Sequence, residues 1–297
     1  MTRLPFSFVD VFTARPLAGA PLALVIDADG LDESQMRAIA REFNQSETTF
    51  LLRPSLPGAT WRLRSFTPIG AEVFGAGHNA LGAWLWLASS GRLPVGNEDP
   101  DLAQEIGGEL LSVKVIREKG RPVVVSMDQS PPQFGESVSD RMELATSLGL
   151  IEDDLVADQP AQVVSTGAGH LLVPVRDRAT VDRAVPDGPR LAASLRQVHG
   201  EGCYLYSLDP VDATDAVAYA RFFNPTVGIW EDPATGTAAG PLVALLVATG
   251  QVPDGTTTVV EQGYSMGRPS RIQVSVSGQS VRLLGSGVVA AEGTLNI

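Results

Sequence analysis

The sequence contains very little cysteine and histidine. Of its 297 residues, one is cysteine (Cys203) and three are histidine. A single cysteine cannot form an intrachain disulfide, so we expect a cytoplasmic protein. So few thiols and imidazoles do not form a cluster with the spacing of a metal site, and no metal is expected.

Positive charge is also scarce. The chain has 22 Lys and Arg against 34 Asp and Glu, a formal net charge of −12. Nucleic acids and anionic membrane surfaces require basic patches, so neither is an expected partner. The sequence also lacks an apolar run long enough to span a bilayer and a signal-peptide pattern at its start. A small anion remains an acceptable ligand, because helix N-termini bind anions whatever the net charge.

The most informative run is residues 221–250, RFFNPTVGIWEDPATGTAAGPLVALLVATG. Two adjacent acids, Glu231 and Asp232, precede a turn of small residues. An almost wholly apolar stretch then begins at Gly236 and Thr237, which predicts a helix buried on all sides. Its N-terminus would favour an anion such as a carboxylate. Acids beside such a site suggest proton transfer next to a bound carboxylate.

Residues 64–91 repeat this pattern. Both runs open with R-x-F-x-P, at 64–68 and 221–225, and an acid follows at Glu72 and Glu231. Apolar helices then start near Gly77 and Gly236, and each stops at a glycine 14 residues later (91−77 and 250−236). Several matches in the same order indicate an internal duplication.

Glu47 occupies a junction between two predicted elements. Asp32 and Gln35 predict a capping box, followed by a helix whose buried face recurs with helical spacing at Met36, Ile39, Ala40 and Phe43. Residues 48–52 read as a strand, so Glu47 lies where a side chain can be directed into a site. A surface or capping glutamate is the alternative interpretation.

Glu47, His78 and Asp232 are the candidates for proton chemistry. Burial and a nearby carboxylate raise the pKa of an acid toward neutrality, as a general base or acid requires. A helix N-terminus keeps a histidine neutral, which fits His78. Asp232 could instead cap the following helix, and His78 could be a loop histidine bonded to the backbone. The remaining candidates are interpreted as structural or surface residues: His170, His199 and Cys203.

Five motifs make the sequence resemble the PhzF-like isomerases of phenazine biosynthesis, relatives in fold of diaminopimelate epimerase. They are FVDVFT at 8–13, IAREFNQSETTF at 39–50, FTP at 66–68, AGH at 76–78 and EDPATGT at 231–237. TGAG at 166–169 and GRPS at 267–270 add support. The likeness runs from about residue 6 to the C-terminus.

The resemblance implies an α+β fold of two pseudo-symmetric domains. Each would be a curved mixed β-sheet or barrel around a buried central helix. We expect an N-terminal domain at 1–128 and a C-terminal domain at 129–284, with a final strand near 285–297 that can return to the first domain. Family members are typically dimeric, so a homodimer is expected.

The resemblance also implies the chemistry. The phenazine enzyme shifts an allylic proton of dihydro-hydroxyanthranilate, a small carboxylate, without a cofactor or metal. By motif match, Glu47 would take and return the proton, and His78 and Asp232 would assist. The substrate-binding residues would be Ser46, Gly77, Gly236 and Thr237.

The sequence departs from the related patterns in its expected chemistry and at two positions that bear on the substrate. Diaminopimelate epimerase uses two cysteines where this chain has Ala76 and Thr235, so its chemistry is not expected. Asn79 replaces a proline of the family, and Thr237 replaces a serine. Two alternatives stay open: a racemase or dehydratase acting on a small amino or hydroxy acid with the same base, and a catalytically silent binding protein that kept the fold.

Overall fold

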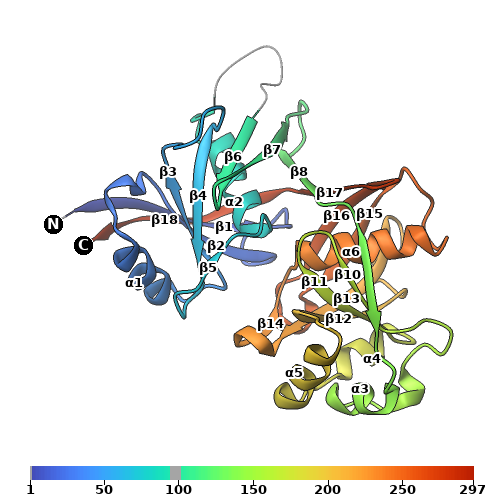
Figure 1. Ribbon diagram of the computed structural model, residues 1–297. Coiled ribbons are helices and arrows are strands. Elements are labelled where there is room, and N and C mark those ends of the chain that lie inside the picture. The colour runs from blue at the N-terminus through green and yellow to red at the C-terminus, as the bar shows by residue number, and fades with distance from the viewer. Residues whose placement is uncertain (1, 94–101) are drawn as a thin grey trace. The chain divides into compact units, whose positions relative to one another are not determined.

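The computed structural model describes residues 2–93 and 102–297 and divides into two compact units (Figure 1). The first unit comprises the described residues up to Asp128 together with Leu284–Ile297, and the second comprises Gln129–Leu283. Within the described part of the chain, no helix combines the length and apolar character needed to cross a membrane.

The first unit is built on a mixed sheet in which the first and the last strand of the chain lie side by side. The pairs β2–β3 and β4–β6 are parallel, and the other pairs are antiparallel. A two-residue strand, β5 (Glu72–Val73), pairs with the end of β4. The main strands, in spatial order, are β18 (Gly287–Asn296), β1 (Arg3–Val11), β2 (Ala20–Val25), β3 (Thr48–Leu52), β4 (Trp61–Phe66), β6 (Leu102–Ile106), β7 (Glu109–Ile116) and β8 (Val124–Gln129).

Helix α2 (His78–Ser89) is the centre of this unit. Ten of its residues, from His78 to Leu87, are buried, and the helix packs against β1, β2, β3, β7 and β18. The sequence folds this way because Leu81, Trp84, Leu85 and Leu87 leave no polar face for solvent. The one polar group of the Trp84 side chain, its indole N–H, donates a hydrogen bond to Gln104 Oε1 at 2.8 Å.

Helix α1 (Glu33–Phe43) packs against β3 and β4. Asp32 accepts the Gln35 amide and Gln35 accepts the Asp32 amide, so the predicted capping box is present. The helix ends at Asn44, whose left-handed conformation (φ 51°) turns the chain toward β3. The predicted apolar face packs with the sheet, where the buried residues include Met36, Ile39, Ala40, Phe50 and Phe66.

The second unit repeats this topology. Its parallel pairs, β11–β12 and β13–β15, fall at the same places in the order as β2–β3 and β4–β6. The short β14 (Ile229–Asp232) pairs with β13 as β5 pairs with β4. The strands in spatial order are β9 (Gln133–Ser137), β10 (Gln162–Ser165), β11 (Gly169–Pro174), β12 (Gly202–Ser207), β13 (Ala216–Asn224), β15 (Thr257–Gln262) and β16 (Ser270–Ser277), and β17 (Ser280–Gly285) follows β16 along the chain.

Helix α6 (Gly236–Ala248) takes the place of α2 and packs against β10, β11 and β16. It starts at a glycine because a Cβ on Gly236 would lie 2.5 Å from Leu283 Cδ2, closer than two carbons approach. Three further helices cover a separate core that includes Leu144, Leu191, Cys203 and Phe223. They are α3 (Arg141–Ser147), α4 (Arg178–Arg183) and α5 (Gly188–Gln197).

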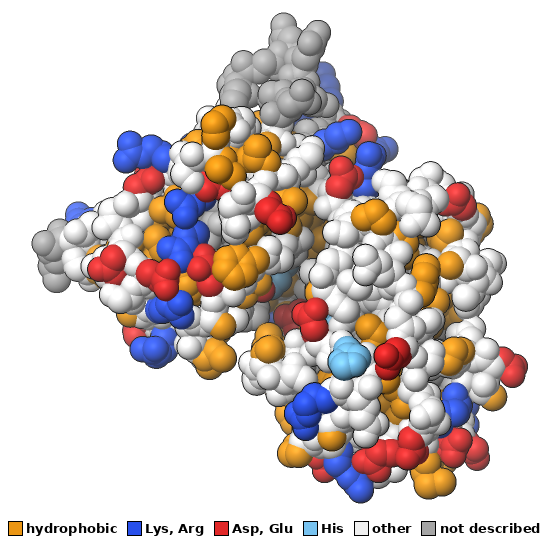
Figure 2. All heavy atoms as spheres, viewed as in Figure 1, with side chains coloured by type: hydrophobic (Ala, Val, Ile, Leu, Met, Phe, Trp, Pro, Cys, Tyr) orange, Lys and Arg blue, Asp and Glu red, His pale blue; other side chains and the backbone are white. Residues whose placement is uncertain are grey.

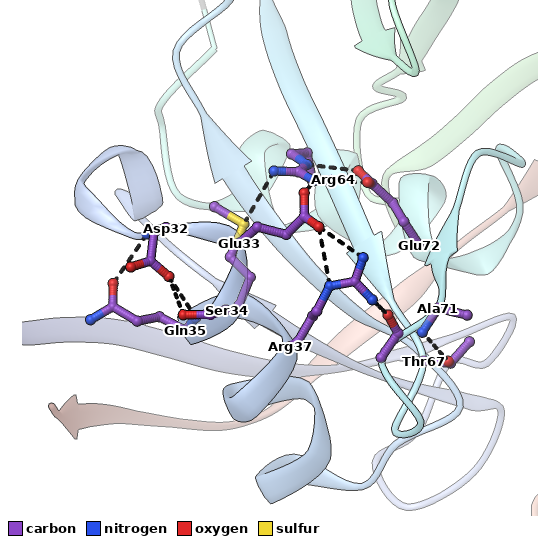
Figure 3. Close-up of polar contacts among 11 residues, drawn as sticks. Asp32, Glu33, Ser34, Gln35, Arg37, Arg64, Thr67, Ala71 and Glu72 are labelled. Atoms are coloured by element: carbon purple, nitrogen blue, oxygen red, sulfur yellow. Dashed lines mark hydrogen bonds and ion pairs between the residues drawn. The ribbon is translucent and has the colours of Figure 1, made fainter.

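The duplicated R-x-F-x-P motif holds the same ion pair in each unit. Arg64 contacts both oxygens of Glu72, at 2.6 and 2.7 Å, and also reaches Glu33 on α1 (Figure 3). Arg221 contacts both oxygens of Glu231, at 2.8 Å each. The predicted α+β fold with two similar halves is confirmed.

On the face shown in Figure 2, acidic, basic and hydrophobic side chains are interspersed rather than sorted into large patches of one kind.

Candidate functional site

The first cluster of candidate residues, Ser46, Glu47 and His78, lies in the first unit. His78 is the first residue of α2, and its Nε2 is 3.4 Å from the Ser46 hydroxyl oxygen. The side chain is buried, and this burial lowers the pKa of His78 to about 4. The imidazole is therefore neutral at physiological pH and can donate or accept one hydrogen bond at Nε2.

Glu47 is held between two rigid elements. It follows the turn at Asn44 and directly precedes β3, where Thr48 and Thr49 are buried. Its own side chain is half-buried. Because Ser46 is its neighbour in sequence, the Ser46–His78 contact places Glu47 in the same region as the start of α2.

Asn79 organises the turn that leads into α2. Its Oδ1 accepts the Gly77 amide at 2.8 Å, and its Nδ2 donates to Gly75 O and Ser65 Oγ. The Gly77 amide is thus engaged by a side chain. The first intrahelical bond of α2 runs from Leu81 to Gly77, so helix geometry leaves the amides of residues 78–80 without intrahelical acceptors.

The second cluster lies at the start of α6 and contains Asp232, Thr235, Thr237 and His170. Asp232 is the last residue of β14 and is buried. Burial raises the pKa of Asp232 to about 6; the Thr235 hydrogen bond opposes the rise, and the Glu231 charge adds to it. Thr235 Oγ1 donates to Asp232 Oδ2 at 2.5 Å. Among the described residues, Asp232 Oδ1 has no hydrogen-bond partner although it is buried.

Glu231 and Glu201 have other roles. Glu231 is committed to Arg221, so of the two adjacent acids only Asp232 is available for proton chemistry. Glu201 precedes β12 as Glu47 precedes β3, but it is exposed and accepts the Gly169 amide at 3.0 Å. The acid found at this position in both units is therefore half-buried only in the first.

His170, which the sequence analysis interpreted as a structural or surface residue, is a further candidate in this second cluster. It lies on β11, is buried, and its Nε2 is 3.2 Å from Thr237 Oγ1. The ring also meets Phe222 edge-on, with centroids 4.9 Å apart. Burial lowers the pKa of His170 to about 4, so it too is neutral. Its position directly after the TGAG motif was the signal in the sequence.

The structure thus brings Ser46 together with His78, and Asp232 together with Thr235. Gly236 and Thr237 form the first turn of α6, where helix geometry leaves their amides without intrahelical acceptors. Across the described ranges, no group of three or more His, Cys, Asp and Glu side chains could hold a metal ion. Both clusters therefore combine a buried acid–base group with a helix N-terminus.

Comparison with known proteins gives this arrangement a family. A model of the PhzC-PhzF family, described as phenazine biosynthesis-like protein, matches residues 9–293. The trans-2,3-dihydro-3-hydroxyanthranilate isomerase of Pseudomonas aeruginosa is 33% identical over 296 residues, which are 96% of each chain. An isomerase of Escherichia coli named YddE is 34% identical over 278 residues, 91% of this chain and 89% of the relative.

A solved structure agrees with these sequence relatives. The PhzF-family phenazine biosynthesis protein of Bacillus anthracis superposes with a TM-score of 0.91 at 29% identity, over 100% of both chains. The match covers both units rather than a single domain. The chain belongs to the PhzC-PhzF family of phenazine biosynthesis-like proteins and is an isomerase.

Proposed function

We propose that the protein is a cofactor-independent isomerase that moves a proton between two carbons of a small, ring-containing carboxylate. The observation that carries the proposal is Asp232, a buried acid with its pKa raised to about 6 and with Oδ1 unsatisfied among the described residues. A buried acid that titrates near neutrality is suited to proton exchange with a bound molecule.

Glu47 is the proposed base. It would remove a proton from one carbon and return it to another while the double bond moves between them, so no electrons are gained or lost. Its position between α1 and β3 gives it a fixed backbone and a half-buried carboxylate. The P. aeruginosa relative is named for an isomerisation of trans-2,3-dihydro-3-hydroxyanthranilate, and a shift of this kind is an isomerisation.

His78 and Asp232 would act as partners of this base. His78 is neutral, so it can hydrogen-bond to the substrate without placing a positive charge beside Glu47. Asp232 in its protonated form can supply a proton to a developing negative charge.

The two helix N-termini are the proposed binding elements for the substrate carboxylate. In α6 the proposed donors are the amides of Gly236 and Thr237, which have no intrahelical acceptors. The Thr237 hydroxyl, which also contacts His170 Nε2, lies in the same turn. In α2 the amide of Gly77 is already bound to Asn79, so the amide of His78 would be the donor there. Free amides and the positive end of the helix dipole both favour a carboxylate.

The test is an isomerisation assay on trans-2,3-dihydro-3-hydroxyanthranilate and related cyclic amino carboxylates, using protein dialysed against a chelator. We expect wild-type turnover to survive dialysis and Glu47→Gln to lower kcat at least about 100-fold, the usual range for loss of a general base. Glu201→Gln, at the equivalent position of the second unit, is the matched control and should retain wild-type activity. Racemised or dehydrated products, or full activity of Glu47→Gln, would contradict the proposal.

A further inference from the structure

A buried hydrogen-bond network surrounds Asp232 and extends beyond the residues assigned so far. Gln262, at the end of β15, is fully buried and contacts three groups near the start of α6 and one on β12. Its Nε2 lies 2.7 Å from Asp232 O and 3.1 Å from Thr235 Oγ1. Its Oε1 lies 3.0 Å from the Thr235 amide and 2.9 Å from the Tyr204 hydroxyl.

The obligatory donors and acceptors of the backbone fix the orientation of the Gln262 amide. The Thr235 amide can only donate, so it must face Oε1, and the Asp232 carbonyl can only accept, so it must face Nε2. If the oxygen and nitrogen of the Gln262 amide were exchanged, its NH₂ group would face the Thr235 N–H, and its oxygen would face the Asp232 carbonyl oxygen. The Gln262 NH₂ group therefore donates its second hydrogen to Thr235 Oγ1.

The Thr235 hydroxyl forms the next link of this network. Its Oγ1 accepts from Gln262, and its single hydrogen is donated to Asp232 Oδ2, 2.5 Å away. Because Oδ2 accepts this hydrogen bond, the proton of a neutral Asp232 does not reside on Oδ2. The other oxygen, Oδ1, is buried and has no partner among the residues that the structure describes.

We infer that Gln262 and Thr235 form a positioning relay that keeps Asp232 Oδ2 an acceptor, so that Oδ1 is the oxygen that carries and exchanges the proton. This inference rests on the proposed function, since it concerns the proton that Asp232 exchanges there. Thr235 and Gln262 act through Asp232 and are positioning residues. The relay explains why a fully buried glutamine lies beneath the start of α6.

Three charged or titratable groups lie around Asp232, and one of them, Glu231, acts on its pKa. Glu231, on the same strand, raises its pKa and is itself held by Arg221 on β13. Tyr204, on β12, is kept in its neutral form by burial and by the Asp232 charge, so its hydroxyl donates to Gln262. Thr235, the N-cap residue of α6, and Gln262, on β15, do not titrate.

The test is an NMR titration of the Asp232 carboxyl carbon in full-length protein labelled with ¹³C-aspartate, with the resonance assigned by its loss in Asp232→Asn. We expect Thr235→Val to raise the pKa of Asp232 by about one pH unit or more, because a hydrogen bond to a carboxylate is lost. Gln262→Met should raise it in the same direction by less, because the Thr235 hydroxyl becomes free to rotate. Thr235→Ser keeps the hydroxyl and should restore the wild-type value.

Gln104→Met is the matched control. Gln104 is also fully buried, but it lies in the first unit and accepts from Trp84. Its replacement should leave the Asp232 titration unchanged. An unchanged pKa in Thr235→Val, or an equal shift in Gln104→Met, would overturn the relay. The titration needs no substrate, so it is independent of the isomerase assay. If the pKa of Asp232 shifts as expected but the protein shows no isomerase activity, the proposed function is refuted and the relay is retained.

Discussion

Arg221 and Glu231 form two parallel hydrogen bonds of 2.8 Å, with each side chain only about one-tenth exposed. The third nitrogen of Arg221 donates to carbonyls at the end of α4, among them Ala184 O at 2.8 Å. The guanidinium thus neutralises the acid next to Asp232 and also caps a helix.

Replacing Arg221 by Met should therefore destabilise the second unit strongly. It leaves Glu231 buried and uncompensated, which costs about 3 kcal/mol in comparable sites. Arg64→Met is the control, since Arg64 makes the same pair with Glu72 in a more exposed setting and should cost about 1 kcal/mol. Hydrogen exchange of the β13 amides measures the loss of stability in the Arg221→Met variant. Equal losses of stability in the Arg221→Met and Arg64→Met variants would contradict this prediction.

Asp232→Asn should stabilise the protein at neutral pH. Because the folded-state pKa of Asp232 is raised from 3.8 to about 6, the folded state binds its proton more tightly than the unfolded state. The contribution of Asp232 to stability is therefore fully present below pH 4 and is lost as pH rises through 6, by about 3 kcal/mol in total. Asparagine removes this loss.

The measurement is thermal unfolding of wild type and Asp232→Asn at pH 4 and at pH 7.5. A gain for the variant at pH 7.5 that is absent at pH 4 is expected. A variant less stable than wild type at pH 7.5 would show that burial of the charged form is not costly.

Asp232 should also control activity. The Asp232→Asn substitution, which is expected to stabilise the protein, should lower its activity. If protonated Asp232 supplies a proton to the substrate, kcat/KM falls as pH rises above about 6. Asp232→Asn should lower activity and abolish this alkaline fall, because asparagine does not titrate. A pH profile of kcat/KM on both proteins tests this, and an unchanged alkaline fall in the variant would assign it to another group.

His170 should make the protein sensitive to acid. Burial holds its folded pKa at about 4, below the 6.5 of an exposed histidine, so its neutral form contributes stability above pH 6.5 that is lost as pH falls toward 4. His170→Gln keeps a donor for Thr237 without the titration. We expect a smaller loss of stability between pH 6.5 and 4 than in wild type, measured by urea unfolding. His199→Gln, at an exposed position two residues after the end of α5, is the matched control and should leave the loss between pH 6.5 and 4 as in wild type.

Much of the fold could be predicted from local patterns. The Asp32 capping box, the apolar face of α1 and the two almost wholly apolar helices are determined by residues close in sequence. The very short strands β5 and β14 were not predicted, because two to four residues carry too little periodicity. Their pairing depends on the turn that follows each R-x-F-x-P motif.

The candidate site was predictable in part. The motifs identified Glu47, His78 and Asp232, and the duplication pointed to Glu72 and Glu231. The environment of Asp232 was not predictable, because Gln262 is 30 residues away and reaches it only through sheet pairing. The contact between His170 and Thr237 was not predictable for a similar reason, because the two residues are 67 positions apart and meet only where β11 packs on α6.

The most direct measurement of the central claim is solvent-deuterium incorporation, followed by NMR, with trans-2,3-dihydro-3-hydroxyanthranilate and other cyclic carboxylates in D₂O. Wild type and Glu201→Gln should each exchange a carbon-bound proton of at least one compound, and Glu47→Gln should not. Exchange that persists in Glu47→Gln, or isomerisation without any protein-dependent exchange, would contradict proton transfer through Glu47.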